Sequence, residues 1–158
     1  MAEDKPDAFW IDIYEPYVAG LDKLDTFSHV IVLSYLHLSS GWRLHVRPPW
    51  LKDGKRQTVG LFASRSPNRP NPIGLTVTEL RRIEGNRIYT GPLDLFDGTP
   101  IIDIKPCISS VDQVPEASNG WLEGTDIDEH LRHHRHELEH GHHHHSHHHH
   151  HHGPEASS

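Results

Sequence analysis

The pattern of apolar and polar positions predicts a chain built mostly from short strands. Residues 27–36 form a nearly continuous apolar run rich in β-branched residues, which is typical of a strand buried on both faces. Looser alternation between apolar and polar positions predicts further strands, at residues 9–14, 42–50, 58–63, 73–82, 87–90 and 100–106. Residues 17–24 predict a turn that leads into a short helical stretch.

Turn signals separate these strands. An Asp-Gly pair lies within residues 52–55, and Glu-Gly-Asn at residues 84–86 predicts a hairpin. Short strands at this spacing predict a mainly β domain with few short helices, folded as a compact, closed or nearly closed β-barrel.

The C-terminal part of the chain has a different composition. Fifteen of the 18 histidines lie from His130 onward, among almost no apolar residues. We therefore expect a domain at residues 7–128 and a disordered tail at residues 129–158. Imidazole suits nickel and zinc, and the candidate ligands are His142, His143, His144, His145, His147 and His148. A purification tag is the alternative, although the irregular histidine spacing favours a native tail.

Three prolines stiffen the loop at residues 64–72, which we call the proline loop. Each fixes its own φ and favours an extended conformation in the residue before it; they are Pro67, Pro70 and Pro72. A stiff loop that carries arginine and asparagine side chains loses little entropy on binding a polar ligand. Gly74, just beyond the loop, allows a close approach of the backbone to its neighbours.

Charge is distributed unevenly along the chain. Residues 41–82 hold nine basic and two acidic residues, a net charge of +7, so the remainder of this chain of total charge −7 carries −14. This asymmetry predicts a basic face for an anionic partner. Three aromatic side chains either pack in the core or stack on an unpaired base; they are Tyr35, Trp42 and Trp50.

Several common activities lack their sequence signals. The chain contains no Gly-x-Gly-x-x-Gly, no P-loop and no Gly-x-Ser-x-Gly, which argues against the usual nucleotide folds and against a serine hydrolase of the α/β class. A single cysteine, Cys107, cannot form an internal disulfide. No signal peptide or long apolar run is present, so we expect a soluble, cytoplasmic protein without a membrane span.

Three blocks of sequence together resemble the TsaA/TrmO family of S-adenosylmethionine-dependent tRNA methyltransferases. The first is Leu-Asp-Thr-Phe-Ser-His-Val-Ile-Val-Leu at residues 24–33. The second runs through residues 41–49 to Gly-Leu-Phe-Ala-Ser-Arg-Ser-Pro-Asn-Arg-Pro-Asn-Pro-Ile-Gly-Leu at residues 60–75. The third is Leu-Asp-Leu-Phe-Asp-Gly-Thr-Pro-Ile-Ile-Asp-Ile-Lys-Pro at residues 93–106. The resemblance covers residues 11–116.

The resemblance implies a homodimeric β-barrel enzyme that methylates N6 of threonylcarbamoyladenosine beside the tRNA anticodon. The cofactor residues implied by similarity are His37, Leu38, Arg65, Leu75, Asp94, Leu95, Phe96 and Asp97. The candidate contacts to tRNA are Arg43, Arg47, Arg69 and Asn71. No residue is assigned as catalytic, and a non-catalytic module that binds cofactor or RNA is the alternative.

The N-terminal residues depart from the family pattern. Family members usually begin with a further strand and an Ile-Gly-x-Ile-x-Ser-Pro-like block, and nothing before Phe9 matches it. We therefore expect an exposed sheet edge and a cofactor pocket that lacks one wall.

Overall fold

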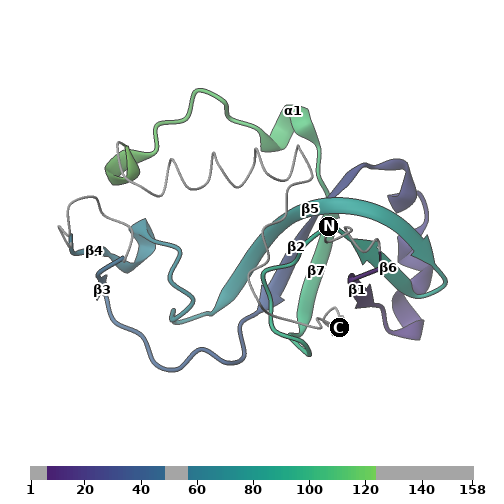
Figure 1. Cartoon of the computed structure of the whole chain (residues 1–158), viewed down its shortest axis with the longest axis horizontal. Coiled ribbons are helices and arrows are strands. Elements are labelled where there is room, and N and C mark those ends of the chain that lie inside the picture. Colours follow the sequence, from purple (N-terminus) through teal and green to yellow (C-terminus); the bar gives the residue numbers. More distant parts are fainter. Residues whose placement is uncertain (1–6, 49–56, 124–158) are drawn as a thin grey trace, which may run out of the picture.

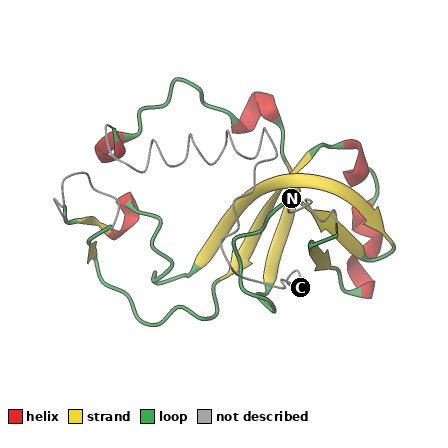
Figure 2. Cartoon of the chain, viewed as in Figure 1, coloured by secondary structure: helices red, strands yellow, loops and turns green. Residues whose placement is uncertain are grey.

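The computed structural model describes residues 7–48 and 57–123, and its secondary structure is mainly β, as predicted (Figure 2). The strands are β1 (Phe9–Asp12), β2 (His29–Tyr35), β3 (His45–Val46), β4 (Val59–Gly60), β5 (Ile73–Glu84), β6 (Arg87–Thr90) and β7 (Ile101–Pro106). The helices are all short: η1 (Glu15–Leu21), η2 (Leu24–Thr26), η4 (Leu61–Ala63) and η5 (Gly120–Leu122) are 3-10 helices, and α1 (Ser109–Asp112) is a single α-helical turn.

The long strand β5 connects the two halves of the main sheet. This antiparallel sheet has the order β1-β6-β5-β2-β7, and β3 and β4 form a separate two-stranded sheet (Figure 1). The first part of β5 pairs with β2 and its last part pairs with β6. The register shifts between Leu80 and Arg82, and β5 curves strongly across the molecule (Figure 1), as expected of a strand with a bulge.

The curvature of β5 allows the two halves of the sheet to share one apolar core. The buried side chains of this core are Ile11, Ile13, Val30, Val32, Leu80, Ile88, Leu93 and Ile101. They come from β1, β2, β5, β6, β7 and the adjoining loops. Each such side chain stabilises the fold by about 1.5–3 kcal/mol relative to an exposed position.

The predicted closed barrel is not seen in residues 7–48 and 57–123. The main sheet is open, since β1 and β7 are its two edges and no register joins them. The bend in β5 explains why the core is covered without closure, because apolar side chains from both halves already bury one another. Among the described residues, β1 and β7 are the edge strands of the main sheet; the exposed edge that we expected from a missing N-terminal strand stays a prediction.

The prediction that β2 is buried on both faces is wrong. Val30, Val32 and Ser34 are buried, whereas the alternate residues of β2 are half-buried or exposed. Antiparallel sheets commonly cover only one face. The uncovered face, which we call the outer face, is formed by Ile31, Leu33 and Tyr35 of β2 with their register partners Val77, Leu75 and Ile73 of β5.

Two predicted strands are shorter than expected. Only His45–Val46 of residues 42–48 is a strand, and the strand predicted at residues 58–63 ends at Gly60. The chain then turns into η4, because both the amide and the hydroxyl group of Ser64 donate to the carbonyl oxygen of Leu61, at 3.1 and 2.7 Å. Leu61 is consequently buried, which a pattern of residue types alone does not predict.

A bidentate ion pair joins the edge strand β1 to β6. Arg87 donates to both carboxylate oxygens of its register partner Asp12, at 2.7 and 3.2 Å, and its guanidinium lies over the ring of Trp10. The hydrogen bond with Asp12 raises the pKa of Arg87. Such cross-strand pairs stabilise a short edge strand.

Some predictions fall outside the described part of the chain. They are the turn at residues 52–55, Trp50, the domain boundary after residue 128 and the histidine-rich tail. Among residues 7–48 and 57–123, no helix has the length and apolar character needed to cross a membrane.

Candidate functional site

Two cavities meet at the proline loop. The first, which we call the strand cavity, has a volume of about 910 Å³ and lies between the end of β2, the start of β5, the proline loop and the turn after Leu93. The second, which we call the arginine cavity, has a volume of about 810 Å³ and lies along the segment between β2 and β3. Ser66 and Asn68 of the proline loop line both cavities.

The strand cavity brings together most of the residues implied as cofactor ligands. Six of the eight line it: Leu38, Arg65, Leu75, Asp94, Leu95 and Phe96. His37 and Asp97 do not line it. The amide of His37 donates to the carbonyl oxygen of Tyr35 at 2.9 Å, and the side chain is exposed just after β2.

Thr99 closes the acidic turn of the strand cavity. Its amide and hydroxyl groups both donate to the carbonyl oxygen of Phe96, at 3.1 and 2.6 Å, and Gly98 adopts a φ of +79°. An aspartate in such a turn can also close it by accepting backbone amides. Within the described residues the closing bonds come from Thr99 instead, so the Asp94 carboxylate lines the cavity without serving the turn.

Arg69 braces the proline loop from inside. One guanidinium nitrogen, Nη1, donates to the carbonyl oxygens of Ser64 and Ser66, at 2.8 and 3.1 Å, and the side chain is half-buried. Arg69 lines the strand cavity, but these two bonds give it a positioning role. Asn71, the other predicted loop ligand, lines neither cavity, and its carbonyl oxygen accepts the amide of Ile73 at 2.8 Å.

Gly74 forms part of the wall of the strand cavity, at a position with no space for a side chain. A Cβ atom at Gly74 would lie 2.6 Å from Oγ of Ser34 and 3.0 Å from Cδ2 of Leu36. Ser34 is fully buried, and its hydroxyl group has no hydrogen-bond partner among the described residues. The close approach predicted for Gly74 is thus an approach of β5 to a side chain of β2.

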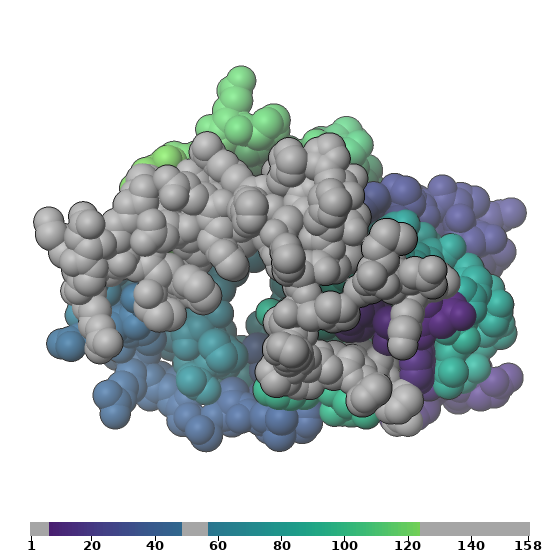
Figure 3. Space-filling view, viewed as in Figure 1, coloured from purple at the N-terminus to yellow at the C-terminus, as the bar shows by residue number. Residues whose placement is uncertain are grey.

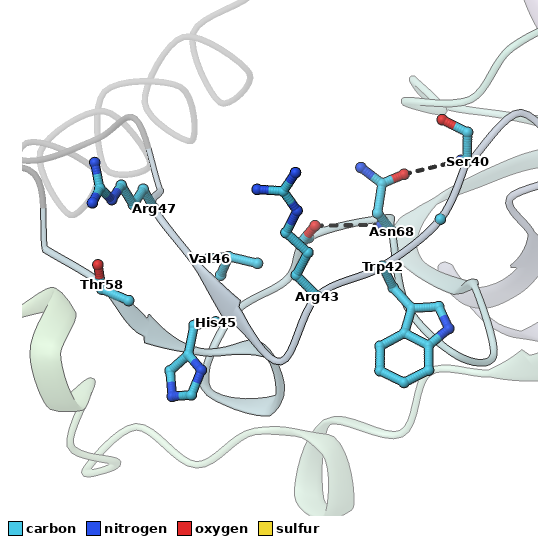
Figure 4. Close-up of a pocket in the computed structure, with 10 residues that line it drawn as sticks. Ser40, Trp42, Arg43, His45, Val46, Arg47, Thr58 and Asn68 are labelled. Atoms are coloured by element: carbon cyan, nitrogen blue, oxygen red, sulfur yellow. Dashed lines mark hydrogen bonds between the residues drawn. The ribbon is translucent and has the colours of Figure 1, made fainter.

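The arginine cavity carries the other two predicted tRNA contacts. Arg43 and Arg47 line it, and the side chain of Trp42 points away from that of Arg43 (Figure 4). Asn68 ties this segment to the proline loop, since its Oδ1 accepts the amide of Ser40 at 3.2 Å. With 52% of its surface exposed, Trp42 is not a core residue.

The predicted basic face can be followed only in part, because Lys52, Lys55 and Arg56 lie outside the described residues. Arg81 and Arg82 lie far along β5, near its pairing with β6, and Arg82 forms ion pairs with Asp7 and Glu84. These carboxylates raise the pKa of Arg82, first through the hydrogen bond with Asp7. Arg69 points into its own loop, so the exposed arginines beside the two cavities, within the described part of the chain, are Arg43, Arg47 and Arg65.

Sequence reasoning missed four residues of the site. Ser66 and Asn68 belong to the quoted motif, but their place between two cavities depends on the path of the chain. For Thr99 the sequence predicted only a turn. Nothing in the sequence indicated a role for Trp121, yet its indole nitrogen donates to the carbonyl oxygen of Ala63 at 2.8 Å, directly before the proline loop.

Comparison with known proteins gives one consistent family. The model of the tRNA-methyltransferase O N-terminal domain matches residues 3–113, and so begins nearer the N-terminus than the resemblance recognised above. The tRNA (adenine(37)-N6)-methyltransferase of Eikenella corrodens is 46% identical over 101 residues, which cover 61% of this chain and 56% of that protein. An S-adenosyl-L-methionine-binding protein of Archaeoglobus fulgidus is 42% identical over 104 residues, covering 66% of this chain and 72% of that protein.

A solved structure supports the same assignment. The crystal structure of TrmO from Pseudomonas aeruginosa superposes with a TM-score of 0.55 at 34% identity, covering 70% of this chain and 46% of that one. The chain thus spans about half the length of these bacterial relatives. The family match, by contrast, includes every strand that the structure describes. The chain therefore belongs to the family of the tRNA-methyltransferase O N-terminal domain.

Proposed function

We propose that this chain is an S-adenosylmethionine-dependent methyltransferase that modifies N6 of adenosine 37 in tRNA, and that the acceptor is threonylcarbamoyladenosine. The observation that carries the proposal is the strand cavity, which gathers six residues implied as cofactor ligands from the end of β2, the proline loop, the start of β5 and the turn after Leu93. The names of the relatives from Eikenella corrodens and Archaeoglobus fulgidus support the reaction and the cofactor respectively. We also propose that the protein is cytoplasmic.

The lining of the strand cavity fits the chemistry of S-adenosylmethionine. The cofactor presents an aromatic base, a sulfonium cation and an amino-acid end with both charges. Leu38, Leu75 and Phe96 offer apolar surface to the base. Asp94 supplies a carboxylate for the positive groups, and Arg65 supplies a guanidinium for the cofactor carboxylate.

The proposed reaction requires alignment of the methyl donor and the acceptor nitrogen more than it requires a strong acid or base. When bound, the cofactor supplies a methyl group on a sulfonium centre: a C–N6 bond forms, the C–S bond breaks to leave a thioether, and one N6 proton passes to solvent. The chain orients the two reactants and excludes water. Arg69 serves orientation by fixing the proline loop, and Asp94 and Arg65 would hold the charged groups of the amino-acid part of the cofactor.

The alternative function is a non-catalytic module that binds cofactor or RNA. Such a module would bind its ligand in the same cavity but transfer no methyl group. Incorporation of labelled methyl groups into tRNA that carries threonylcarbamoyladenosine separates the two functions. Incorporation at adenosine 37 supports the enzyme, and binding without incorporation supports the module.

Calorimetric titration of S-adenosylmethionine into the full chain tests the assignment of the cavity. We expect Arg65→Ala to weaken binding by about tenfold or more, because a hydrogen bond between two charged groups is lost. Lys105→Ala removes an exposed cation from β7, outside both cavities, and is the matched control. Equal affinities for the two variants would contradict the proposed cofactor site.

A further inference from the structure

We infer that the arginine cavity binds an oxyanion of the acceptor RNA and so anchors the substrate beside the strand cavity. The oxyanion is either a backbone phosphodiester or the threonyl carboxylate of the modified base, since a guanidinium pair recognises both. The inference rests on the proposed function, because it names the part of the RNA that this second cavity recognises.

The charges of the arginine cavity favour an anion. Arg43 and Arg47 line it, both are exposed, and neither forms an ion pair with another described residue. No aspartate or glutamate is among the described residues that line it. Two guanidinium groups with no carboxylate among these described neighbours favour an anion, and an RNA oxyanion would neutralise them.

The side chains that line the arginine cavity favour an anionic ligand. Arg43, Arg47 and Asn68 all line it, and the side chains of Arg43 and Asn68 point to the same side in the view of Figure 4. Oδ1 of Asn68 already accepts the amide of Ser40, so the Asn68 NH₂ group is the one available to donate to a ligand. Three side chains that line one cavity thus carry hydrogen-bond donors that suit an oxyanion.

The position of the arginine cavity connects anchoring with methyl transfer. Ser66 and Asn68 line both cavities, so an RNA held by Arg43 lies directly beside the proposed cofactor. The Ser40–Asn68 hydrogen bond fixes the segment that carries Arg43 to the proline loop. This arrangement places the acceptor and the methyl donor on opposite sides of the same two residues.

Arg43→Gln and Arg47→Gln in the full chain test this inference. We would measure dissociation constants for two tRNAs of identical sequence, one with threonylcarbamoyladenosine and one unmodified, over a series of salt concentrations. Lys23→Gln is the matched control, because Lys23 is exposed near η2, at the opposite end of the molecule from β3 and β4 (Figures 1 and 3). Calorimetry with S-adenosylmethionine checks that the variants retain the strand cavity.

We expect each arginine variant to bind RNA about tenfold more weakly than the control. If the ligand is a phosphodiester, both RNAs lose affinity equally and the logarithmic salt slope falls by about one. If it is the threonyl carboxylate, only the modified RNA loses affinity. Wild-type affinity of both variants for both RNAs would overturn the inference but leave the proposed function intact. Failure of the wild-type chain to bind either RNA would overturn both.

Discussion

At the scale of single residues, the contact between Ser34 and Gly74 explains why a motif glycine must be glycine. The sequence indicated a close approach at Gly74 but could not identify the neighbour, because pairing of β2 with β5 joins residues 40 positions apart. The roles within the proline loop were likewise only half predictable. Its stiffness follows from the prolines, whereas the inward turn of Arg69 follows from carbonyl groups that only the folded loop presents.

Gly74→Ala should lower the free energy of unfolding by about 1–3 kcal/mol, because the added methyl group collides with Oγ of Ser34. Ser34→Ala alone should have little effect, since the hydroxyl group has no described partner whose bond would be lost. In the variant that combines Ser34→Ala with Gly74→Ala, the free energy of unfolding should fall by less than in Gly74→Ala alone. Urea denaturation measures all three values.

Gly60→Ala is the control for this cycle, because no atom lies within 4 Å of the position of its Cβ. Its effect should stay within about 0.5 kcal/mol. Additive effects of the Ser34 and Gly74 substitutions would show that the close contact does not determine the choice of glycine.

At the scale of secondary-structure elements, the pattern of apolar and polar residues predicted two kinds of strand. They are the strands that pair with the next strand in the sequence and the strands that pair with a strongly apolar strand. Strand β6 and the hairpin that leads to it were predicted at the correct residues, and β2 and β7 to within a few positions. The strand predicted at residues 58–63 is a strand only in its first half. Ser64 hydrogen-bonds back to Leu61, and the second half of the predicted strand is the 3-10 helix η4 instead. Local hydrogen bonds of this kind compete with a sheet and leave little trace in hydrophobic alternation.

The segment after β7 braces the proline loop from outside through Trp121. Residues 114–123 lie beyond the family match, and they run from α1 back toward η4 (Figure 1). Trp121→Phe removes the indole donor to the carbonyl oxygen of Ala63 while retaining an aromatic ring. We expect the amides of Leu61 and Ser64 to exchange about tenfold faster with deuterated solvent, since a neutral hydrogen bond stabilises by about 1 kcal/mol.

Exchange of the β6 amides should not change in Trp121→Phe, which separates local loosening from global unfolding. Trp42→Phe is the matched control, because Trp42 is exposed and its indole has no described hydrogen bond. Unchanged exchange at Leu61 and Ser64 would rule out a bracing role for Trp121.

At the scale of the whole molecule, the outer face of β2 and β5 is unusually apolar for an exposed surface. Tyr35, Leu75 and Val77 expose 46%, 54% and 52% of their surfaces. The sequence could not predict this, because a continuous apolar run does not say which of its faces is covered. Contiguous exposed apolar surface commonly marks an interface. Ile73, Leu75 and Val77 of this face also line the strand cavity. We therefore propose that a second copy of the chain covers the β2 part of the outer face, at Ile31, Leu33 and Tyr35, in line with the homodimer that the family resemblance implies.

Tyr35→Lys should weaken self-association at least about tenfold, because it places a charge in the proposed interface. Tyr35 does not line the strand cavity, so the substitution does not alter its walls directly. Sedimentation equilibrium of the full chain measures the dimer constant. Val111→Lys, at an exposed position on α1, is the control. A wild-type chain that stays monomeric at high concentration would exclude the homodimer.

The residues shared by the two cavities have a thermodynamic consequence. Ser66 and Asn68 belong to a loop that is braced by Arg69 within and by Trp121 outside, so any ligand that orders this loop further does so for both cavities. Donor and acceptor then bind with a coupling free energy, and linkage requires the coupling to be reciprocal. The factor by which methyl donor tightens RNA binding must equal the factor by which RNA tightens donor binding, and any variant that changes one factor must change the other by the same amount.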